Sequence, residues 1–253
     1  MRLEGKVAVI TGAASGFGRA GAVRFAAEGA AVVVTDLDGD GLDETLAQVA
    51  HAGGRGVASV GDVTSAADNE AAVALAERTY GGLDVMWANA GVPQSFRPIG
   101  EIEPEEFDRI QAVNARGPWL GARAALPAMR RRGGGSFVIT ASLSGLKARP
   151  DATAYQTSKG SAVMLTRSLS REFAPHNVRV NSVCPLAAET PMWAKFMDNY
   201  MELDEASKVF AAAVPLGRLA TVDDIVNAAL FLAGDESSFI TGVNLPVDGG
   251  AAA

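Results

Sequence analysis

Short apolar runs alternate along the whole chain with longer segments of helical periodicity. The apolar runs lie at residues 7–10, 31–35, 56–60, 83–87 and 136–141. Between them, apolar residues recur at the spacing of amphipathic helices, most extensively over residues 104–132 and 153–173. Alternating strands and helices are typical of βαβ units, in which helices cover a parallel sheet. The pattern therefore predicts an α/β protein.

Composition adds the domain organisation to this picture. The chain has 253 residues, 48% of them hydrophobic, which is enough for one large core. No repeat, low-complexity tract or linker interrupts the alternation. We therefore expect a single domain over residues 1–253.

Charge and cysteine content exclude several classes of partner. A net charge of −7 argues against nucleic acid, because binding to phosphates needs a clustered cationic surface. Arg130, Arg131 and Arg132 precede three glycines and are expected to end a helix. One cysteine and two distant histidines predict no metal site. No signal peptide or membrane span is recognisable, so we expect a soluble, cytoplasmic protein without a membrane partner.

The first apolar run leads into a glycine-rich turn. Gly12, Gly16 and Gly18 separate the run from the next helical segment. Such a strand, turn and helix point backbone N–H groups and a positive helix end at an anionic group, as in dinucleotide sites. Turns of this kind also occur without nucleotides, so this motif needs support from other parts of the chain.

Polar residues follow the next three strands. Asp36, after the second strand, is placed to accept hydrogen bonds from an adenosine ribose and to repel a 2′-phosphate, which favours NAD over NADP. Asp62, after the third strand, can reach an adenine amino group, or can cap the next helix together with Thr64. Asn89, after the fourth, either faces the ligand or forms a turn.

The strongest chemical pattern lies in the second half of the chain. Tyr155 and Lys159 are four residues apart in a predicted helix, so they share one face. An ammonium and a helix N-terminus both favour a phenolate, so we expect the Tyr155 pKa to be lowered. Ser142 stands at the end of the preceding strand, at the sheet edge where ligands bind.

Together these motifs resemble the classical short-chain dehydrogenase/reductase family over essentially the whole chain. Residues 11–18 match its cofactor motif, and Asn89, Ala90 and Gly91 match most of its Asn-Asn-Ala-Gly motif. Asn114, Ser142, Tyr155 and Lys159 have the spacing of its catalytic tetrad. Residues 247–250 resemble its C-terminal strand and turn.

The resemblance implies a doubly wound Rossmann sheet of about seven parallel strands, with helices on both faces. A cofactor half would cover about residues 1–92 and a catalytic half about 93–253. Within the catalytic half, large apolar residues spaced for helices over about 189–214 predict either a mobile substrate lid or an ordinary core or subunit-contact face. The implied cofactor-binding residues are Gly12, Ser15, Gly16, Phe17, Gly18, Asp36, Leu37, Asp62, Val63, Asn89, Ala90, Gly91, Tyr155, Lys159, Pro185, Leu186, Ala188 and Thr190. The implied substrate pocket comprises Gln94, Ser142, Ser144, Tyr155, Leu186, Ala187 and Trp193. Family members are commonly tetramers, so a homotetramer is expected.

The family also implies a role for each member of the tetrad. Tyr155 would be the general acid in reduction and the general base in oxidation. Ser142 would bind the substrate oxygen, where charge develops. Lys159 would hold the nicotinamide ribose and lower the Tyr155 pKa, and Asn114 would hold a water in a proton relay.

Two positions depart from the family pattern. Ala88 replaces the first Asn of the Asn-Asn-Ala-Gly motif. Leu186 replaces a glycine in the loop that normally grips the nicotinamide, and Ala188 replaces a branched residue there. Because Thr190 is retained, we expect cofactor binding in an altered geometry.

The most specific expectation is an NAD-dependent dehydrogenase or reductase of a small, mostly apolar secondary alcohol or ketone. One alternative is a 3-oxoacyl-thioester reductase, although an acidic carrier protein would need a basic rim. Another is a dinucleotide-binding regulator with little turnover, which the intact Ser142, Tyr155 and Lys159 disfavour. Arg97 could meet an anionic substrate, but a solvated loop arginine is the simpler interpretation.

Overall fold

The fold is a single domain built on one parallel sheet. The computed structural model describes residues 1–198 and 200–253. Its strands are β1 (Val7–Thr11), β2 (Ala31–Asp36), β3 (Arg55–Val60), β4 (Val85–Ala88), β5 (Gly135–Thr140), β6 (Val178–Pro185) and β7 (Asn244–Val247). They lie in the order β3-β2-β1-β4-β5-β6-β7, and every neighbouring pair is parallel. The prediction of a Rossmann-type sheet of about seven strands is confirmed.

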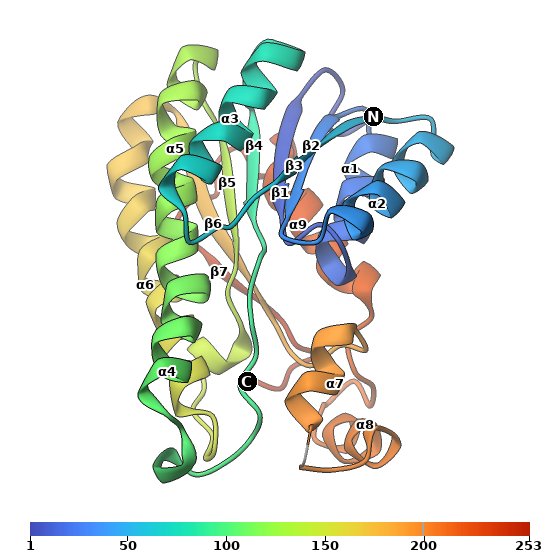
Figure 1. The fold of residues 1–253 in the computed structure, drawn as a ribbon, viewed down its shortest axis with the longest axis vertical. Coiled ribbons are helices and arrows are strands. Elements are labelled where there is room, and N and C mark those ends of the chain that lie inside the picture. The colour runs from blue at the N-terminus through green and yellow to red at the C-terminus, as the bar shows by residue number, and fades with distance from the viewer. Residues whose placement is uncertain (199) are drawn as a thin grey trace.

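Helices cover both faces of the sheet (Figure 1). The helices are α1 (Gly16–Ala27), α2 (Gly39–His51), α3 (Ala66–Tyr80), α4 (Pro104–Gln111), α5 (Gly117–Arg132), α6 (Thr153–Phe173), α7 (Pro191–Met197), α8 (Leu203–Ala212) and α9 (Val222–Ala233). Helices α1 and α9 pack on one face, and α3, α5 and α6 on the other. None of the helices in the described part of the chain has the length and apolar character needed to cross a bilayer.

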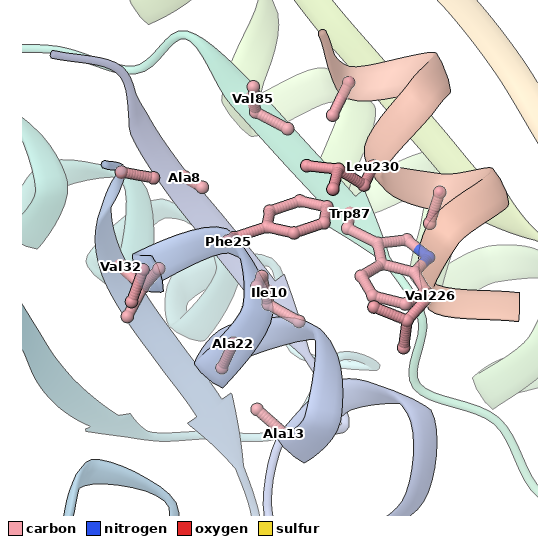
Figure 2. Packing of buried hydrophobic residues seen from close by; sticks show 14 of the residues in the cluster. Ala8, Ile10, Ala13, Ala22, Phe25, Val32, Val85, Trp87, Val226 and Leu230 are labelled. Atoms are coloured by element: carbon pink, nitrogen blue, oxygen red, sulfur yellow. The ribbon is translucent and has the colours of Figure 1, made fainter. Parts of the chain in front are cut away.

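The apolar runs form strands because the sheet buries them on both faces. All five residues of β1 and the first five of β2 are buried. On the α1 side, Phe25 stacks on Trp87 of β4 with ring centroids 5.6 Å apart. Figure 2 shows both rings packed against Val226 and Leu230 of α9. This dense packing fixes α1, and with it the turn that precedes the helix.

The predicted helix over residues 104–132 is interrupted. Helix α4 passes into a π-helical segment, Ala112–Arg116, before α5 begins. Asn114 lies in this segment, buried, where its polar side chain finds partners that a regular helix would not offer it. Helix α5 ends as expected, with Arg130, Arg131 and Arg132 in its last turn and Gly133 in a left-handed conformation.

Beyond the carboxyl ends of the strands, α7 and α8 form a separate helical layer, drawn in orange at the bottom of Figure 1. Trp193, Met197, Ala206 and Leu219 form a small apolar core there. Aromatic rings from this layer face the main body of the molecule, since Phe196 of α7 contacts Tyr155 of α6. The layer lies in the segment for which either a substrate lid or a core or subunit-contact face is expected, and the lid stays a prediction.

Candidate active site

A cavity of about 710 Å³ lies at the carboxyl ends of the strands. It runs from the turn before α1, past Ser142 and Tyr155, to α7 and α8. The sheet order reverses between β1 and β4, and ligands of open α/β sheets bind at such a switch point. The cavity is therefore the candidate functional site.

Two glycines of the turn, Gly12 and Gly18, have no room for a side chain. A Cβ on Gly12 would lie 2.8 Å from the Cα of Ala90, and one on Gly18 would lie 2.1 Å from the carbonyl oxygen of Gly12. Gly12 and Gly16 also have positive φ angles of 66° and 53°. Gly12 and Gly16 line the cavity, whereas Gly18 packs beneath the turn.

The N-terminus of α1 opens into the same cavity. Its N-cap residue, Ser15, makes no capping hydrogen bond through its side chain, and Ser15, Gly16 and Phe17 line the cavity. The first N–H groups of a helix have no partner within the helix, and together with the helix dipole they attract an anion. This arrangement fits the pyrophosphate of a dinucleotide.

Asp36 lies at the end of β2, as the motif predicts. Its carboxylate accepts hydrogen bonds from the backbone N–H groups of Ala14 (3.1 Å) and Asp38 (3.2 Å), and it lines the cavity. The side chain is thereby held between the glycine turn and the start of α2. Leu37, beside it, is 69% exposed.

Asp62 and Val63 lie outside the residues that line the cavity. The Asp62 carboxylate accepts a hydrogen bond from Thr64 N–H (2.8 Å). Ser65 is the N-cap of α3 and accepts from Asp68 N–H (3.3 Å). The alternative in which Asp62 and Thr64 cap the helix is therefore wrong, because α3 begins at Ala66, after both residues, and Ser65 caps it.

Asn89 braces the strands beneath the cavity. The backbone N–H groups of Asn89 and Ala90 both donate to Thr11 Oγ1 at 2.9 Å. The Asn89 side chain donates to Thr11 O (3.0 Å) and accepts from Thr140 Oγ1 (3.0 Å). Asn89 thus ties β1, β4 and β5 together while Asn89, Ala90 and Gly91 line the cavity.

Leu186 is accommodated without strain. It continues the pairing of β6 with β7, since its N–H donates to Val247 O (3.2 Å). The non-glycine residues with positive φ in the described chain are Asp151 and Asn177, so Leu186 does not adopt a glycine-like conformation. Leu186 lines the cavity together with Pro185, Ala187, Ala188 and Thr190.

Ser142, Tyr155 and Lys159 meet in the middle of the cavity. Tyr155 and Lys159 are buried one turn apart on α6, and the Lys159 Nζ lies 5.7 Å from the centre of the Tyr155 ring. Lys159 Nζ donates to Thr140 O (2.8 Å) at the end of β5. Ser142 follows that strand, and its Oγ accepts from Ser144 N–H (3.1 Å). The strand end and the helix face bring the three groups together.

The pKa values in this group are set by burial. Burial raises the pKa of Tyr155 to about 12, and a hydrogen bond with Ser142 opposes this effect. Burial lowers the pKa of Lys159 to about 8. The expectation of a lowered Tyr155 pKa is wrong for this structure, because desolvation by burial is the largest effect on this phenol. Tyr155 is held as a neutral phenol, ready to donate a proton.

Asn114 lies behind this group. Its Oδ1 accepts from Val92 N–H (2.8 Å), and its Nδ2 donates to Val92 O (2.9 Å) and Ser158 Oγ (3.1 Å). These bonds connect the π-helical segment to the loop after β4 and to α6. The role in a water relay stays a prediction.

Aromatic side chains form the far wall of the cavity. Phe96, Trp193, Phe196 and Phe210 all line it, and they come from the loop after β4, from α7 and from α8. Tyr155 contacts Phe196 edge-on at 5.0 Å, and Trp193 contacts Phe210 edge-on at 5.0 Å. This wall fits an apolar substrate body. Of the expected pocket residues, Ser144, Leu186, Ala187 and Trp193 also line the cavity.

Gln94 is outside this wall, although it was expected in the pocket. It is 1% exposed, accepts a hydrogen bond from Tyr155 N–H (2.9 Å) and donates to Asp151 O (3.3 Å). It therefore binds the first turn of α6 and holds Tyr155 from behind. Arg97 is also engaged elsewhere, in an ion pair with Glu106, so the interpretation as a solvated arginine is wrong.

Sequence reasoning missed several cavity residues, among them the cations Lys147, Arg149 and Lys195. Lys147 and Arg149 lie in the segment between Ser142 and Tyr155, and Lys195 lies on α7. Their spacing forms no motif. The signal that the sequence offered was the position of Lys147 and Arg149 in the short connection between two expected active-site residues, Ser142 and Tyr155.

Comparisons with known proteins agree with this geometry. A family model described as Enoyl-(Acyl carrier protein) reductase matches residues 12–252. The chain is 41% identical over 251 residues to the 4-formylbenzenesulfonate dehydrogenase TsaC1/TsaC2 of Comamonas testosteroni, covering 99% of each protein.

Two solved structures extend the comparison. The crystal structure of levodione reductase is similar with a TM-score of 0.96 and 32% identity, covering 99% of each chain. A 3-ketoacyl-(acyl-carrier-protein) reductase from Brucella melitensis, complexed with NADH, is similar with a TM-score of 0.92 and 39% identity, covering 99% of this chain and 100% of that one.

Proposed function

Because the chain belongs to the classical short-chain dehydrogenase/reductase family, we propose that it transfers a hydride between NAD(H) and a small, mostly apolar secondary alcohol or ketone. The observation that carries the proposal is the meeting of Ser142, Tyr155 and Lys159 in a cavity with an anion-binding turn at one end and aromatic rings at the other. The net reaction is ketone + NADH + H⁺ ⇌ secondary alcohol + NAD⁺.

Ser142 and Tyr155 handle the substrate oxygen. The Ser142 hydroxyl accepts a hydrogen bond from Ser144 N–H, so its own proton is available to the carbonyl oxygen of a ketone. Tyr155, kept protonated by its raised pKa, donates a proton to that oxygen in reduction and takes it back in oxidation. A bound nicotinamide would supply or accept the hydride at the carbon.

Lys159 and the turn before α1 bind and orient the cofactor. The Lys159 ammonium is anchored to Thr140 O and retains protons for a ribose hydroxyl. The N–H groups at the start of α1 suit the pyrophosphate, and Asp36 suits the adenosine ribose. The 2′-phosphate of NADP would meet the Asp36 carboxylate. Arg19, a nearby cation, is paired with Glu44 and donates to Ala14 O, so it is not free to offset that repulsion.

The test is absorbance of the reduced nicotinamide, with purified protein, a panel of secondary alcohols, and NAD⁺ or NADP⁺ in separate reactions. We expect turnover with NAD⁺ and little with NADP⁺. Asp36→Asn keeps an acceptor for Ala14 N–H but removes the charge. The ratio of kcat/KM for NAD⁺ to kcat/KM for NADP⁺ should therefore fall about tenfold. Equal turnover with both cofactors in the unchanged protein would contradict the assignment of Asp36.

A second candidate is reduction of 3-oxoacyl thioesters. It is supported by the name of the Brucella melitensis relative and by Lys147 and Lys195 at the cavity, which offer positive charge that the acidic composition does not suggest. Higher kcat/KM for acetoacetyl thioesters than for any simple ketone would favour it. Binding of NAD⁺ without turnover of any substrate would instead favour a regulator.

We also propose a homotetramer assembled through α5 and α6. Large apolar side chains on these helices are exposed, with Trp119 48% and Met164 58% accessible. Such residues on the surface of a single chain are typical of interfaces. Light scattering on the eluting protein measures the mass, and a monomer would contradict this proposal.

A further inference from the structure

The charges around the cavity are distributed unevenly. Among the described residues that line it, Asp36 is the only carboxylate, and it lies at the cofactor end. Arg149 and Lys195 line the end formed by Phe96, α7 and α8, and Lys147, which also lines the cavity, donates to Ala251 O (2.9 Å). The chain as a whole has a net charge of −7, so the overall composition does not explain positive charge at this end of the cavity.

Arg149 is the cation of this group that is most firmly placed. Its guanidinium carbon lies 3.8 Å from the ring centre of Phe96 and 5.1 Å from that of Phe210. Its backbone is held by Gln156, which accepts from Arg149 N–H (3.0 Å) and donates to Arg149 O (2.6 Å). A stacked guanidinium on a fixed backbone presents its N–H groups in a defined direction.

Arg149 is the arginine that lines the cavity, and it has no ion-pair partner among the described residues. Elsewhere in the described chain, eight arginines lie within 4 Å of a carboxylate: Arg2, Arg19, Arg24, Arg97, Arg123, Arg131, Arg132 and Arg218. No carboxylate of the described residues comes that close to Arg149. Burial lowers the pKa of Arg149, an effect that Tyr200 and Asp151 oppose. A half-buried guanidinium without a carboxylate at ion-pair distance can accept an anionic partner.

The walls between Arg149 and Tyr155 are aromatic. The Tyr155 ring contacts Phe196 at 5.0 Å, Phe196 stacks on Phe96 at 5.7 Å, and Phe96 carries the Arg149 guanidinium. A ligand whose carbonyl lies at Tyr155 would therefore pass two phenyl rings before it reaches the cation. We propose that the substrate carries a carboxylate or sulfonate that binds Arg149, separated from the reacting carbon by an apolar body that packs against these rings.

This proposal rests on the function proposed above and adds the substrate class to it. A competing explanation is that Arg149 only holds the lid by stacking on Phe96 and Phe210. The two explanations differ in what they predict. A purely structural Arg149 affects all substrates equally, whereas an anion-binding Arg149 discriminates between charged and neutral substrates of the same shape.

The kinetic test compares reduction of 4-acetylbenzoate and 4-acetylbenzamide, which match in size and differ in charge, with acetophenone as the unsubstituted reference. We expect kcat/KM for the carboxylate to exceed that for the amide by about 10- to 100-fold. In Arg149→Met, which keeps an apolar stem, that ratio should fall to near one while acetophenone is still reduced. Arg149→Lys should retain part of the preference.

Lys208→Met is the matched control. It removes one positive charge from exposed α8, and Lys208 does not line the cavity. The preference for the carboxylate should be unchanged in this variant. Equal kcat/KM for carboxylate and amide in the unchanged protein, or equal loss for both in Arg149→Met, would overturn the proposal and leave Arg149 a structural residue.

A binding measurement separates failure of this proposal from failure of the proposed function. Calorimetry in the presence of NAD⁺ gives the affinity for each ketone without turnover. Tighter binding of 4-acetylbenzoate than of the amide, lost in Arg149→Met, would support the anion site even if no ketone were reduced. Equal affinities would overturn it, whatever the reductase activity.

Discussion

The two ends of the cavity differ in whether backbone or side chains form the surface. At the cofactor end, Gly12 and Gly16 and the first N–H groups of α1 form the surface, so the backbone makes it. At the substrate end, side chains of Phe96, Arg149 and Phe210 make it, and they come from two loops and a helix. The backbone end accepts one shape of ligand, whereas the side-chain end can be altered residue by residue. The difference explains how one scaffold serves many substrates.

The largest loss of ligand affinity is expected at the cofactor end, where the backbone forms the surface of the cavity. In Gly18→Ala the new Cβ would lie 2.1 Å from Gly12 O, a backbone atom that cannot turn aside. The turn must shift, so NAD⁺ affinity should fall at least about 100-fold. Calorimetric titration with NAD⁺, with circular dichroism to verify folding, measures this loss.

Gly160→Ala provides the comparison for that variant. Gly160 lies within α6, and no atom is within 4 Å of a Cβ placed there. Alanine is favoured over glycine in a helix by roughly 0.5–1 kcal/mol, so this variant should be slightly stabilised and bind NAD⁺ normally. Comparable losses in both variants would contradict the steric account of the glycine turn.

An intermediate effect, on the free energy of unfolding, is expected where the two ends of the cavity meet and Lys159 is buried. The Lys159 pKa is lowered from 10.5 to about 8 on folding. Between these pH values the unfolded chain binds a proton that the folded chain releases, so the free energy of unfolding rises with pH. This contribution, on the order of 1–3 kcal/mol, should be absent in Lys159→Met. Urea unfolding of both proteins from pH 7 to 10 measures the difference, and parallel curves would argue against a buried Lys159.

The smallest loss of ligand affinity is expected at the substrate end, where side chains form the surface of the cavity. Phe210→Ala removes edge-on packing with Trp193 and one of the two rings beside Arg149. Aromatic contacts of this kind contribute about 0.5–1.5 kcal/mol, so KM for acetophenone should rise up to about tenfold. The affinity for NADH should stay the same. A parallel loss of NADH affinity would mean that the two ends are not independent.

Much of the fold could be predicted from the sequence because burial on both faces makes strands such as β1 and β2 continuously apolar. The interruption at Asn114 could not be predicted, since periodicity does not distinguish a continuous helix from one with a π-helical segment. The start of α3 was placed too early because Asp62, Thr64 and Ser65 are all suitable caps, and only the three-dimensional structure selects Ser65.

The residues of the candidate site also divide into those that could be predicted from the sequence and those that could not. Gly12, Asp36 and Tyr155 were recognisable because each lies at a fixed distance from a strand end or within one helical turn of a partner. Gln94 was misplaced and Arg149 missed because their surroundings come from segments distant in sequence: Gln94 contacts Tyr155 and Asp151, and Arg149 contacts Phe210. The direction of the Tyr155 pKa shift was also predicted wrongly, since helix spacing reveals that a lysine is near but not how deeply the phenol is buried.

The central claim is that Tyr155 moves the proton while the rest of the cavity binds NAD(H) without it. The most direct test is reduction of acetophenone by Tyr155→Phe, followed by absorbance of NADH, with NADH binding measured on the same preparation. We predict that kcat falls about 10²- to 10⁴-fold and that NADH affinity stays within about twofold of the unchanged protein. Undiminished kcat in Tyr155→Phe would contradict the account.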